Sequence, residues 1–368
     1  MNQTLKPGLR WPLRVLALVA LTATATAAAN GEAPGKPAST TPPPELGDVK
    51  WARGFDNALA HATSAKRPLL VLFQEVPGCG TCINYGQQVL SHPLIVEAAE
   101  SLFLPVAVYN NIPGPDEKTL KSFKEKAWNN PVVRIISPDC ADLAPKVAGN
   151  YTVAGLAKAM VHALRNFDRD IPPYLELLSL ETTARARGVE RATFAMHCFW
   201  EGEGALGRIP GVVGTLPGFL DKMEVVEVEF DPRVVDYRTL VRRARSVQCA
   251  SRVFTRSDDQ QKTAAEMVGR LAVRSDDAIR PDKEPKYYLS KSPMRFVPMT
   301  GLQACRVNAA VGAKGDARSF LSPRQVQLLA LIQEYPKAGW SDATGRKDLV
   351  AAWTRAAAIA QKLRHKVP

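Results

Sequence analysis

The stretch LLVLFQEVPGCGTC, residues 69–82, decides the fold of the first half of this chain. Leu69–Phe73 is an unbroken apolar run, which is typical of a β-strand buried on both faces. Cys79 and Cys82 follow it three positions apart, and helical spacing of apolar residues resumes at Ile83. A cysteine at a helix N-terminus feels partial positive charge, which lowers its pKa and favours the thiolate. The pattern therefore predicts a reactive dithiol at a strand-to-helix junction.

Five further segments flank this junction in an order that fits one fold. Apolar periodicity predicts three helices and two more strands, namely helices over 51–65, 93–101 and 153–164 and strands over 102–109 and 132–136. Asn130-Pro131 directly precedes the last strand, and Ser91-His92-Pro93 precedes the second helix. Over about residues 50–166 this order resembles the thioredoxin fold, in particular the exported thioredoxin-like domains that carry electrons into periplasm-like spaces.

The position in this fold gives three residues expected roles. Cys79 is the attacking thiol, and Cys82, one turn inside the helix, resolves the mixed disulfide. The resemblance implies that Pro131 is a cis-proline that faces the pair and presents backbone to the incoming polypeptide. Gly78 replaces the tryptophan usual before the first cysteine, and Phe73 replaces a buried acid. The redox potential therefore does not follow from the sequence.

A metal site is the alternative use of a C-x-x-C pair. Structural zinc sites take four ligands, commonly from two pairs of cysteine or histidine at short spacing. The sequence offers no second pair at such a spacing, because the other cysteines are isolated from one another: Cys140, Cys198, Cys249 and Cys305. We therefore expect thiol redox chemistry, with no metal and no cofactor.

A second group of motifs lies between residues 190 and 293. Cys198-Phe199-Trp200 follows a predicted strand, and Glu224 opens another strand that ends in Phe230-Asp231-Pro232. Residues 287–293 then read YYLSKSP. Over about 100 residues this order resembles the A-type peptide methionine sulfoxide reductases. The resemblance implies an α+β domain that reduces the S epimer of oxidised methionine.

The same resemblance assigns a reaction to four residues. Cys198 attacks the electrophilic sulfur of a sulfoxide, and the oxygen leaves only when a proton reaches it, which is the role of Glu224. Phe199 and Trp200 hold the substrate methyl group and exclude water. The product is a sulfenic acid on Cys198, which a second thiol must resolve.

Two other cysteines are candidates for that resolving thiol. Cys249 stands where the family has a tyrosine, and Cys305 lies in the tail where the family keeps resolving cysteines. The chain also departs from the family pattern: Phe219 takes the place of a substrate-binding tyrosine and lacks its hydroxyl, and Met196-His197 replaces two glycines. The family's His-Asp-Pro loop is missing as well. These changes remove donors that would stabilise developing charge.

Three other interpretations stay open. Cys198 is an inert buried thiol in the first, since free cysteine is among the most buried residue types. In the second, the reductase-like region is a binding module for methionine-containing proteins, and the chemistry is confined to Cys79 and Cys82. The third makes the protein a redox sensor or a metal chaperone. An apolar, accessible site around Glu224 would favour the enzyme, and a filled pocket would favour the binding module.

The first 29 residues have the three regions of a signal peptide. Met1–Arg14 is basic, and the apolar run Val15–Ala29 ends in an A-x-A-like cleavage site. We expect an exported protein, periplasmic or extracellular, in which disulfides are permitted; a retained N-terminal anchor is the alternative. Cleavage would lower the net charge from +12 to +9, because it removes Lys6, Arg10 and Arg14 and no acid.

Composition and charge bound the rest of the chain. A hydrophobic content of 46% and a charged content of 23% indicate an ordinary globular protein. The basic residues are scattered without aromatic interleaving, so we expect no nucleic acid, and the mature chain contains no apolar run that would span a membrane. The expected partners are oxidised proteins or peptides and an external thiol donor. The expected regions are a Pro-rich linker (30–48), a thioredoxin-like domain (49–167), a linker (168–189), a reductase-like domain (190–298) and a helical extension (299–368).

Overall fold

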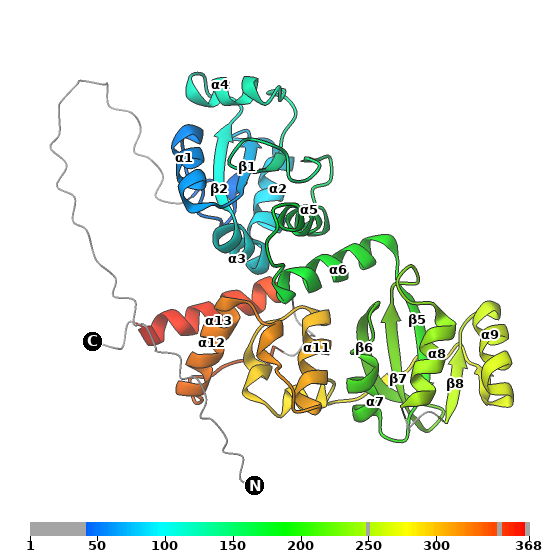
Figure 1. Ribbon diagram of the computed structural model, residues 1–368. Helices are drawn as coiled ribbons and strands as arrows, with labels where there is room; N and C mark the ends of the chain where they lie inside the picture. The colour runs from blue at the N-terminus through cyan, green and yellow to red at the C-terminus, as the bar shows by residue number, and fades with distance from the viewer. Residues whose placement is uncertain (1–41, 248–250, 344–347, 365–368) are drawn as a thin grey trace, which may run out of the picture. The chain divides into compact units, whose positions relative to one another are not determined.

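The computed structural model describes residues 42–247, 251–343 and 348–364 (Figure 1). They form two β-sheets, each covered by helices, and a helical region toward the C-terminus. The α/β and α+β fold class predicted from the sequence is confirmed. The predicted signal peptide and residues 30–41 of the predicted linker lie outside the described residues. Within the described ranges, no helix combines the length and apolar character that a membrane crossing requires.

The first sheet is built around the apolar run that follows residue 68. Its strands are β1 (Leu69–Gln74), β2 (Leu104–Tyr109), β3 (Val132–Ile136) and β4 (Val147–Ala148), in the order β2-β1-β3-β4. β1 is parallel to β2 and antiparallel to β3. Every residue of β1 is buried, as predicted for a strand covered on both faces. Alternation along the strand places Leu70 and Leu72 in one core and Leu69, Val71 and Phe73 in the other.

Helices cover both faces of this sheet. They are α1 (Phe55–Ala65), α2 (Gly80–Tyr85), the π-helical segment η2 (Gly86–Leu90), α3 (Pro93–Leu102), α4 (Pro115–Ser122) and α5 (Val153–Asn166). α3 and α5 contribute to the core with Leu70 and Leu72, whereas α1 and α4 contribute to the other. The first helix begins four residues later than predicted. Ala52 instead forms an isolated bridge with Val106, and Gly54 has a φ of 85°, outside the helical region.

Two segments assigned to linkers from the sequence are structured. Residues 44–46 form a turn of 3-10 helix, η1 (Pro44–Leu46), in which Glu45 and Leu46 are buried. α6 (Pro173–Arg187) occupies most of residues 168–189. Its Leu175 and Leu178 are fully buried, and with Tyr174 they join the core that contains α3 and α5. A helix with a buried apolar face therefore occupies most of the stretch predicted as the second linker.

The second sheet has six strands in the order β10-β6-β7-β5-β8-β9. They are β5 (Glu190–Ala195), β6 (Val212–Leu220), β7 (Met223–Phe230), β8 (Arg252–Thr255), β9 (Ala272–Arg274) and β10 (Arg280–Pro281). β7 is central and antiparallel to both β5 and β6. Phe194, Val226 and Phe230 from these strands form a core with α7 (Phe199–Leu206), α8 (Tyr237–Ser246) and α9 (Asp258–Val268).

The described residues after 299 are largely helical, as predicted. The helical segments not yet given are η3 (Gly269–Leu271), α10 (Tyr287–Ser290), η4 (Pro293–Phe296), α11 (Gly301–Gly312), η5 (Arg318–Phe320), α12 (Pro323–Glu334) and α13 (Leu349–Arg364). Ser322 caps α12, with its side chain accepting from the Gln325 N–H while the Gln325 side chain returns to the Ser322 N–H. Leu329, Ile332 and Ala356 form a third core with residues of α11.

Candidate functional site

The two cysteines of the C-x-x-C lie at the start of α2, immediately after β1. Cys79 is the N-cap residue of the helix and is exposed, whereas Cys82, one turn inside, is fully buried. Both are free thiols, and their Sγ atoms are 3.6 Å apart. The thiol expected to attack is therefore the exposed one, and the thiol expected to resolve is the buried one. The distance is short enough for the pair to close into a disulfide after a small side-chain movement.

The environments of the two thiols differ in a way that separates their reactivity. Hydrogen bonds from the Cys82 backbone N–H and side chain, supported by those from Thr81, lower the pKa of Cys79. Burial, followed by the hydrogen bond with Cys79 and its charge, raises the pKa of Cys82 to about 11. The exposed sulfur is thus the better nucleophile, because the thiolate is the reactive form.

The loop that leads into β3 completes this first site, because the start of β3 pairs with the end of β1. The Asn130–Pro131 bond is cis, as expected from the resemblance. The Cys82 thiol donates to Oδ1 of Asn130 over 2.6 Å, which places this loop against the buried sulfur. Asn130 itself is held by a 3.1 Å bond from its Nδ2 to the Ala127 carbonyl. The neutral Cys82 thiol therefore has a defined acceptor.

One group of side chains near the pair offers metal-binding atoms. Glu75, Cys79 and Cys82 each place one such atom within 4.8 Å of the other two. Three donors fall one short of the tetrahedral set that structural zinc takes. We assign no metal to this group, and the absence of a metal stays a prediction.

The second site is built around Cys198, at the junction of β5 and α7. Cys198 is the N-cap residue of α7 and is partly exposed. Glu224 of β7 binds the loop on both sides of it: its backbone carbonyl accepts from the Met196 N–H over 2.8 Å, and its Oε2 accepts from the Phe199 N–H over 2.9 Å. The carboxylate therefore lies at the N-terminus of α7, bonded to the residue that follows Cys198. The two residues expected to share a reaction are brought together.

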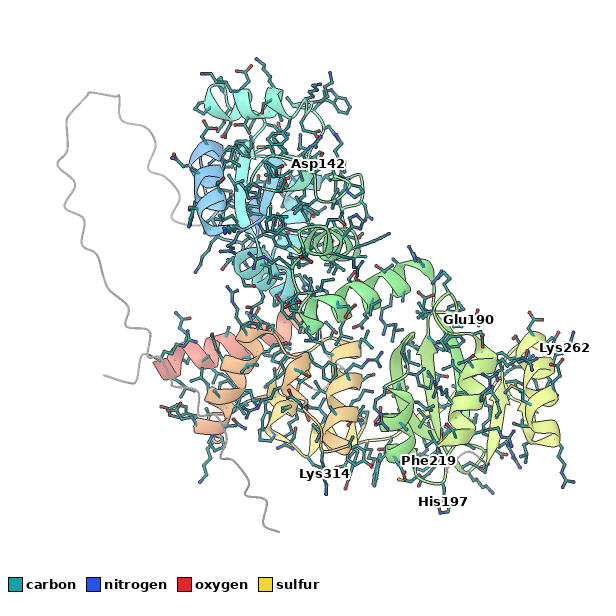
Figure 2. The ribbon with its side chains drawn as sticks, viewed as in Figure 1. Asp142, Glu190, His197, Phe219, Lys262 and Lys314 are labelled. Carbon is teal, nitrogen blue, oxygen red and sulfur yellow. The ribbon has the colours of Figure 1, made fainter. Side chains whose placement is uncertain are left out.

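Aromatic side chains surround this junction. The ring of Phe199 packs edge-on against that of Phe219, with 5.3 Å between centroids, and lies 5.4 Å from that of Trp200. Phe219 is the cross-strand neighbour of Glu224. Figure 2 shows Phe219 and His197, the residue before Cys198, at the same end of the second sheet. Carboxylate, thiol and aromatic surface thus meet at one edge, and Glu224 remains partly exposed there.

Three residues of this surface were not predicted from the sequence. Tyr287 stacks on Trp200 with 4.0 Å between centroids and 12° between planes, and Asp282 accepts the Trp200 indole N–H over 3.1 Å. The guanidinium of Arg280 lies over the Phe219 ring, 4.4 Å from its centroid. The YYLSKSP motif pointed to Tyr287 without giving it a role. Asp282 and Arg280 reach the site only because β10 pairs with β6.

Cys305 does not join this site in the described conformation. It is buried on α11, where its sulfur lies 3.4 Å from Oγ1 of Thr215, and its Cβ is close to Gly207 at the C-terminal end of α7. Cys198 caps the opposite end of the same eight-residue helix. At 1.5 Å per residue the two ends are about 12 Å apart, whereas a disulfide requires Cα atoms within about 7 Å. A direct Cys198–Cys305 bond would require these helices to move.

Cys249 lies outside the described residues. Ser251, two positions after it, donates its N–H to the Ala195 carbonyl over 3.2 Å. Ala195 is three residues before Cys198. Ser251, the first described residue after the gap, is therefore bonded to the strand that leads to Cys198.

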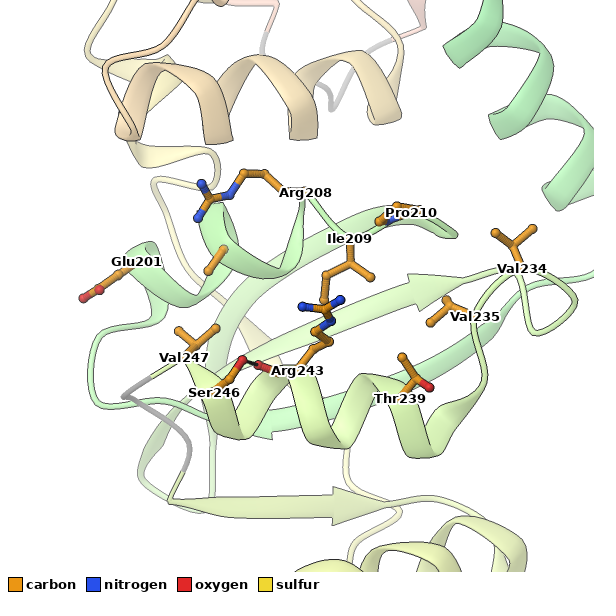
Figure 3. Close-up of a pocket in the computed structure, with 11 residues that line it drawn as sticks. Glu201, Arg208, Ile209, Pro210, Val234, Val235, Thr239, Arg243, Ser246 and Val247 are labelled. Carbon is orange, nitrogen blue, oxygen red and sulfur yellow. Dashed lines mark hydrogen bonds between the residues drawn. The ribbon is translucent and has the colours of Figure 1, made fainter.

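A separate cavity of about 700 Å³ lies between α7 and α8 (Figure 3). Its walls combine the apolar side chains of Ile209 and Val235 with the guanidinium groups of Arg208 and Arg243. None of the site residues predicted from the sequence lines it. We assign this cavity no part in the sulfur chemistry.

Comparisons with known proteins found similarity to two kinds of protein, thioredoxin-like domains and peptide methionine sulfoxide reductases. A family model described as thioredoxin-like matches residues 50–138. The peptide methionine sulfoxide reductase MsrA of Methanoculleus marisnigri is 39% identical over 75 residues, 16% of this chain and 46% of that protein. The MsrA of Methanothermobacter thermautotrophicus is 32% identical over 151 residues, 29% of this chain and 89% of that protein. The chain thus spans about half of the first relative and most of the second.

A solved structure titled DsbH Oxidoreductase is also similar. It shares 17% identity and covers 35% of this chain and 94% of its own length, with a TM-score of 0.28. That score is too low to support an argument about the fold.

The thioredoxin-like region and the similarity to methionine sulfoxide reductases together define an oxidoreductase that acts on sulfur groups. The match to the Methanothermobacter protein, which covers nearly its whole length, identifies the family more closely. The chain belongs to the peptide methionine sulfoxide reductase MsrA family, with a thioredoxin-like region in addition.

Proposed function

We propose that this protein is an exported reductase of methionine sulfoxide in proteins or peptides, acting on the S epimer. Cys198 is the nucleophile of this reaction, and the dithiol of Cys79 and Cys82 returns it to the reduced state. The observation that carries the proposal is the position of Glu224, whose backbone and carboxylate hold the residues on both sides of Cys198. Sulfoxide reduction requires a nucleophile and a proton donor close together in space, and Glu224 is bonded to the residue that follows Cys198.

The first step breaks the sulfur–oxygen bond of the substrate. The Cys198 thiolate attacks the sulfoxide sulfur while Glu224 delivers a proton to the oxygen. The resulting hydroxyl group then passes to the Cys198 sulfur as the new sulfur–sulfur bond breaks, so methionine leaves and Cys198 remains as a sulfenic acid. Methionine is reduced by two electrons and Cys198 is oxidised by two. Oε2 of Glu224 accepts from the Phe199 N–H, and Oε1 has no hydrogen-bond partner among the described residues, which leaves it available to the substrate.

The surrounding side chains suit an apolar substrate with one polar atom. Phe199, Trp200 and Phe219 offer apolar surface for the methyl and methylene groups of methionine. Arg280 makes no ion pair within the described ranges and lies over the ring of Phe219. Its guanidinium is the group we propose as a donor to the sulfoxide oxygen, in place of the hydroxyl that Phe219 lacks.

The second stage returns Cys198 to the thiol. A second thiol condenses with the sulfenic acid, releases water and forms a disulfide, and we propose Cys249 for this step in preference to Cys305. The thiolate of Cys79 then attacks that disulfide, and Cys82 displaces it to leave a Cys79–Cys82 disulfide. An external dithiol supplies the two electrons and two protons that reopen the pair.

Turnover of the two epimers of methionine sulfoxide by the purified protein tests this function directly. With dithiothreitol as reductant, the S epimer should be reduced and the R epimer should remain. A protein that reduces neither epimer, yet still reduces a disulfide substrate, would leave the second region as a binding module. Export is tested separately, by N-terminal sequencing of the protein recovered from the periplasm or medium, which should begin after Ala29.

A further inference from the structure

A segment that the sequence assigns to the Pro-rich linker lies directly against the C-x-x-C helix. The backbones of η1 and η2 approach closely because a glycine stands on each side of the contact, Gly47 after η1 and Gly86 in η2. A Cβ on Gly86 would lie 2.0 Å from the Pro44 carbonyl oxygen. A Cβ on Gly47, whose φ is 59°, would lie 2.5 Å from the Gly86 carbonyl oxygen. Trp51 holds the segment from the other side through a 2.9 Å bond from its indole N–H to the Leu46 carbonyl. These residues therefore belong to the folded domain.

This segment contributes a buried carboxylate. Glu45 is only 3% exposed, and no lysine or arginine among the described residues pairs with it. Its Oε1 accepts from the Gly78 N–H over 2.7 Å, and its backbone carbonyl accepts from the buried side chain of Gln74. A carboxylate removed from water is costly unless its oxygens are hydrogen-bonded. The side chain of Glu45 is consequently held by one loop, the one that contains Gly78.

That loop carries the first cysteine. Gly78 immediately precedes Cys79 and packs on Cys82, since a Cβ at position 78 would lie 2.8 Å from Cβ of Cys82 and 3.1 Å from its sulfur. Glu45, Gly78 and Cys82 therefore form a chain of direct contacts. The acid that a thioredoxin-like strand would have at Phe73 is absent, and a carboxylate reaches the pair from the N-terminal segment instead.

We propose that Glu45 is a positioning residue of the Cys79–Cys82 pair, which fixes Gly78 against Cys82 and sets a carboxylate beside the dithiol. The inference rests on the proposed redox role of the pair. Because the disulfide is neutral and the reduced pair carries a thiolate, a nearby carboxylate disfavours the reduced form. Glu45 should therefore make the pair a stronger reductant, which suits a thiol that must pass electrons on.

Few other charges face the pair. Glu75 follows β1 and lies within 4.8 Å of both sulfurs. α2 adds the phenol of Tyr85, whereas η2 and residues 129–131 carry no titratable side chain. Changing Glu45 alone should therefore produce a measurable change in the titration of the pair.

The test compares Glu45→Gln, Glu45→Ala and a matched control, Glu117→Gln, in the full chain. Glutamine keeps the size and the acceptor for Gly78 but removes the charge, and Glu117 is an exposed acid on α4 that pairs with Lys121. Two quantities are measured: the pH midpoint of Cys79 alkylation, and the reduction potential against glutathione. Glu45→Gln should lower the midpoint by about half a pH unit and make the potential less negative. Glu45→Ala should also slow disulfide exchange about tenfold, because Gly78 is released.

The inference is overturned if Glu45→Gln and Glu117→Gln give the same midpoint and the same potential as the wild-type protein. Failure of Glu45→Ala to fold does not affect this comparison, since the glutamine variant keeps the hydrogen bond. The pH midpoint of Cys79 alkylation can be measured whether or not the protein reduces a substrate. A wild-type protein that reduces no disulfide, but whose midpoint shifts in Glu45→Gln, would contradict the proposed function and support the role of Glu45.

Discussion

Cys79 and Cys198 occupy the same local position in two different folds. Each is the N-cap residue of a helix that follows a strand, each has an extended backbone, and neither helix start has a side-chain cap from its cysteine. The two sites differ in the polar side chain that lies beside the cysteine. Cys79 has the thiol of Cys82 at 3.6 Å, whereas Cys198 has the carboxylate of Glu224 bonded to the next backbone N–H.

The helix start supplies the same electrostatic environment at both cysteines, and the neighbouring side chain decides which reaction each can perform. A helix N-terminus places partial positive charge beside the sulfur in either place. A second thiol lets the first exchange disulfides, because it can displace whatever the first has bound. A carboxylic acid instead supplies the proton that an oxygen leaving group needs. The two sites therefore suit two successive reactions, one that accepts an oxygen atom and one that returns electrons.

The largest effect should come from exchanging each nucleophile for serine. Cys198→Ser should abolish methionine sulfoxide reduction and leave the reduction of an insulin disulfide unchanged, because serine cannot form the sulfenic intermediate. Cys79→Ser should abolish disulfide reduction and leave a single turnover at Cys198 intact. Both activities are measured on each variant. Loss of both activities in either variant would mean that the sites are not chemically separate.

Glu224→Gln should slow methionine sulfoxide reduction by roughly 10²–10⁴-fold, the range typical of a lost general acid. Glutamine can still accept from the Phe199 N–H, so the loop around Cys198 should keep its conformation. Single-turnover kinetics separate the chemical step from thiol recycling. Glu227→Gln on the same strand is the control, because Glu227 pairs with arginines and not with the Cys198 loop. An equal loss in both variants would contradict the role of Glu224.

The pH dependence of alkylation should distinguish the two thiols of the first site. Hydrogen bonds lower the pKa of Cys79, and burial raises that of Cys82 to about 11. Since only thiolates react, Cys79 should be labelled at neutral pH at least about a hundredfold faster, and Cys82 should become reactive only as the pH approaches 11. Mass spectrometry of digested protein gives both rates. Preferential labelling of Cys82 would reverse the assigned roles.

The features that could be predicted from the sequence are those encoded locally. Cys79 and Cys198 each follow an apolar strand and open a helix, and both junctions can be read from residues within one short window. The cis bond before Pro131 and the pairing of Glu224 with Cys198 were instead implied by the two family resemblances.

The features that could not be predicted depend on long-range contacts. Glu45 lies 33 residues from Gly78, within a proline-rich stretch whose composition suggested a tether. Asp282 lies 82 residues from Trp200 and reaches it through strand pairing. Periodicity reports which face of an element is apolar, but not which polar side chain from elsewhere will lie beside it.

The smallest expected effects come from one orienting hydrogen bond in each site. Asn130→Ala removes the acceptor of the Cys82 thiol, and Asp282→Ala removes the acceptor of the Trp200 indole. A single hydrogen bond of this kind contributes about 1 kcal/mol, or roughly fivefold in rate or affinity. Asn130→Ala should change disulfide reduction by about that factor and leave sulfoxide reduction in dithiothreitol unchanged. Asp282→Ala should raise the KM for methionine sulfoxide about fivefold and leave disulfide reduction unchanged, because Trp200 is no longer held against the substrate. If either substitution alters both activities equally, its effect is on the stability of the protein as a whole, which a thermal unfolding curve of each variant would show.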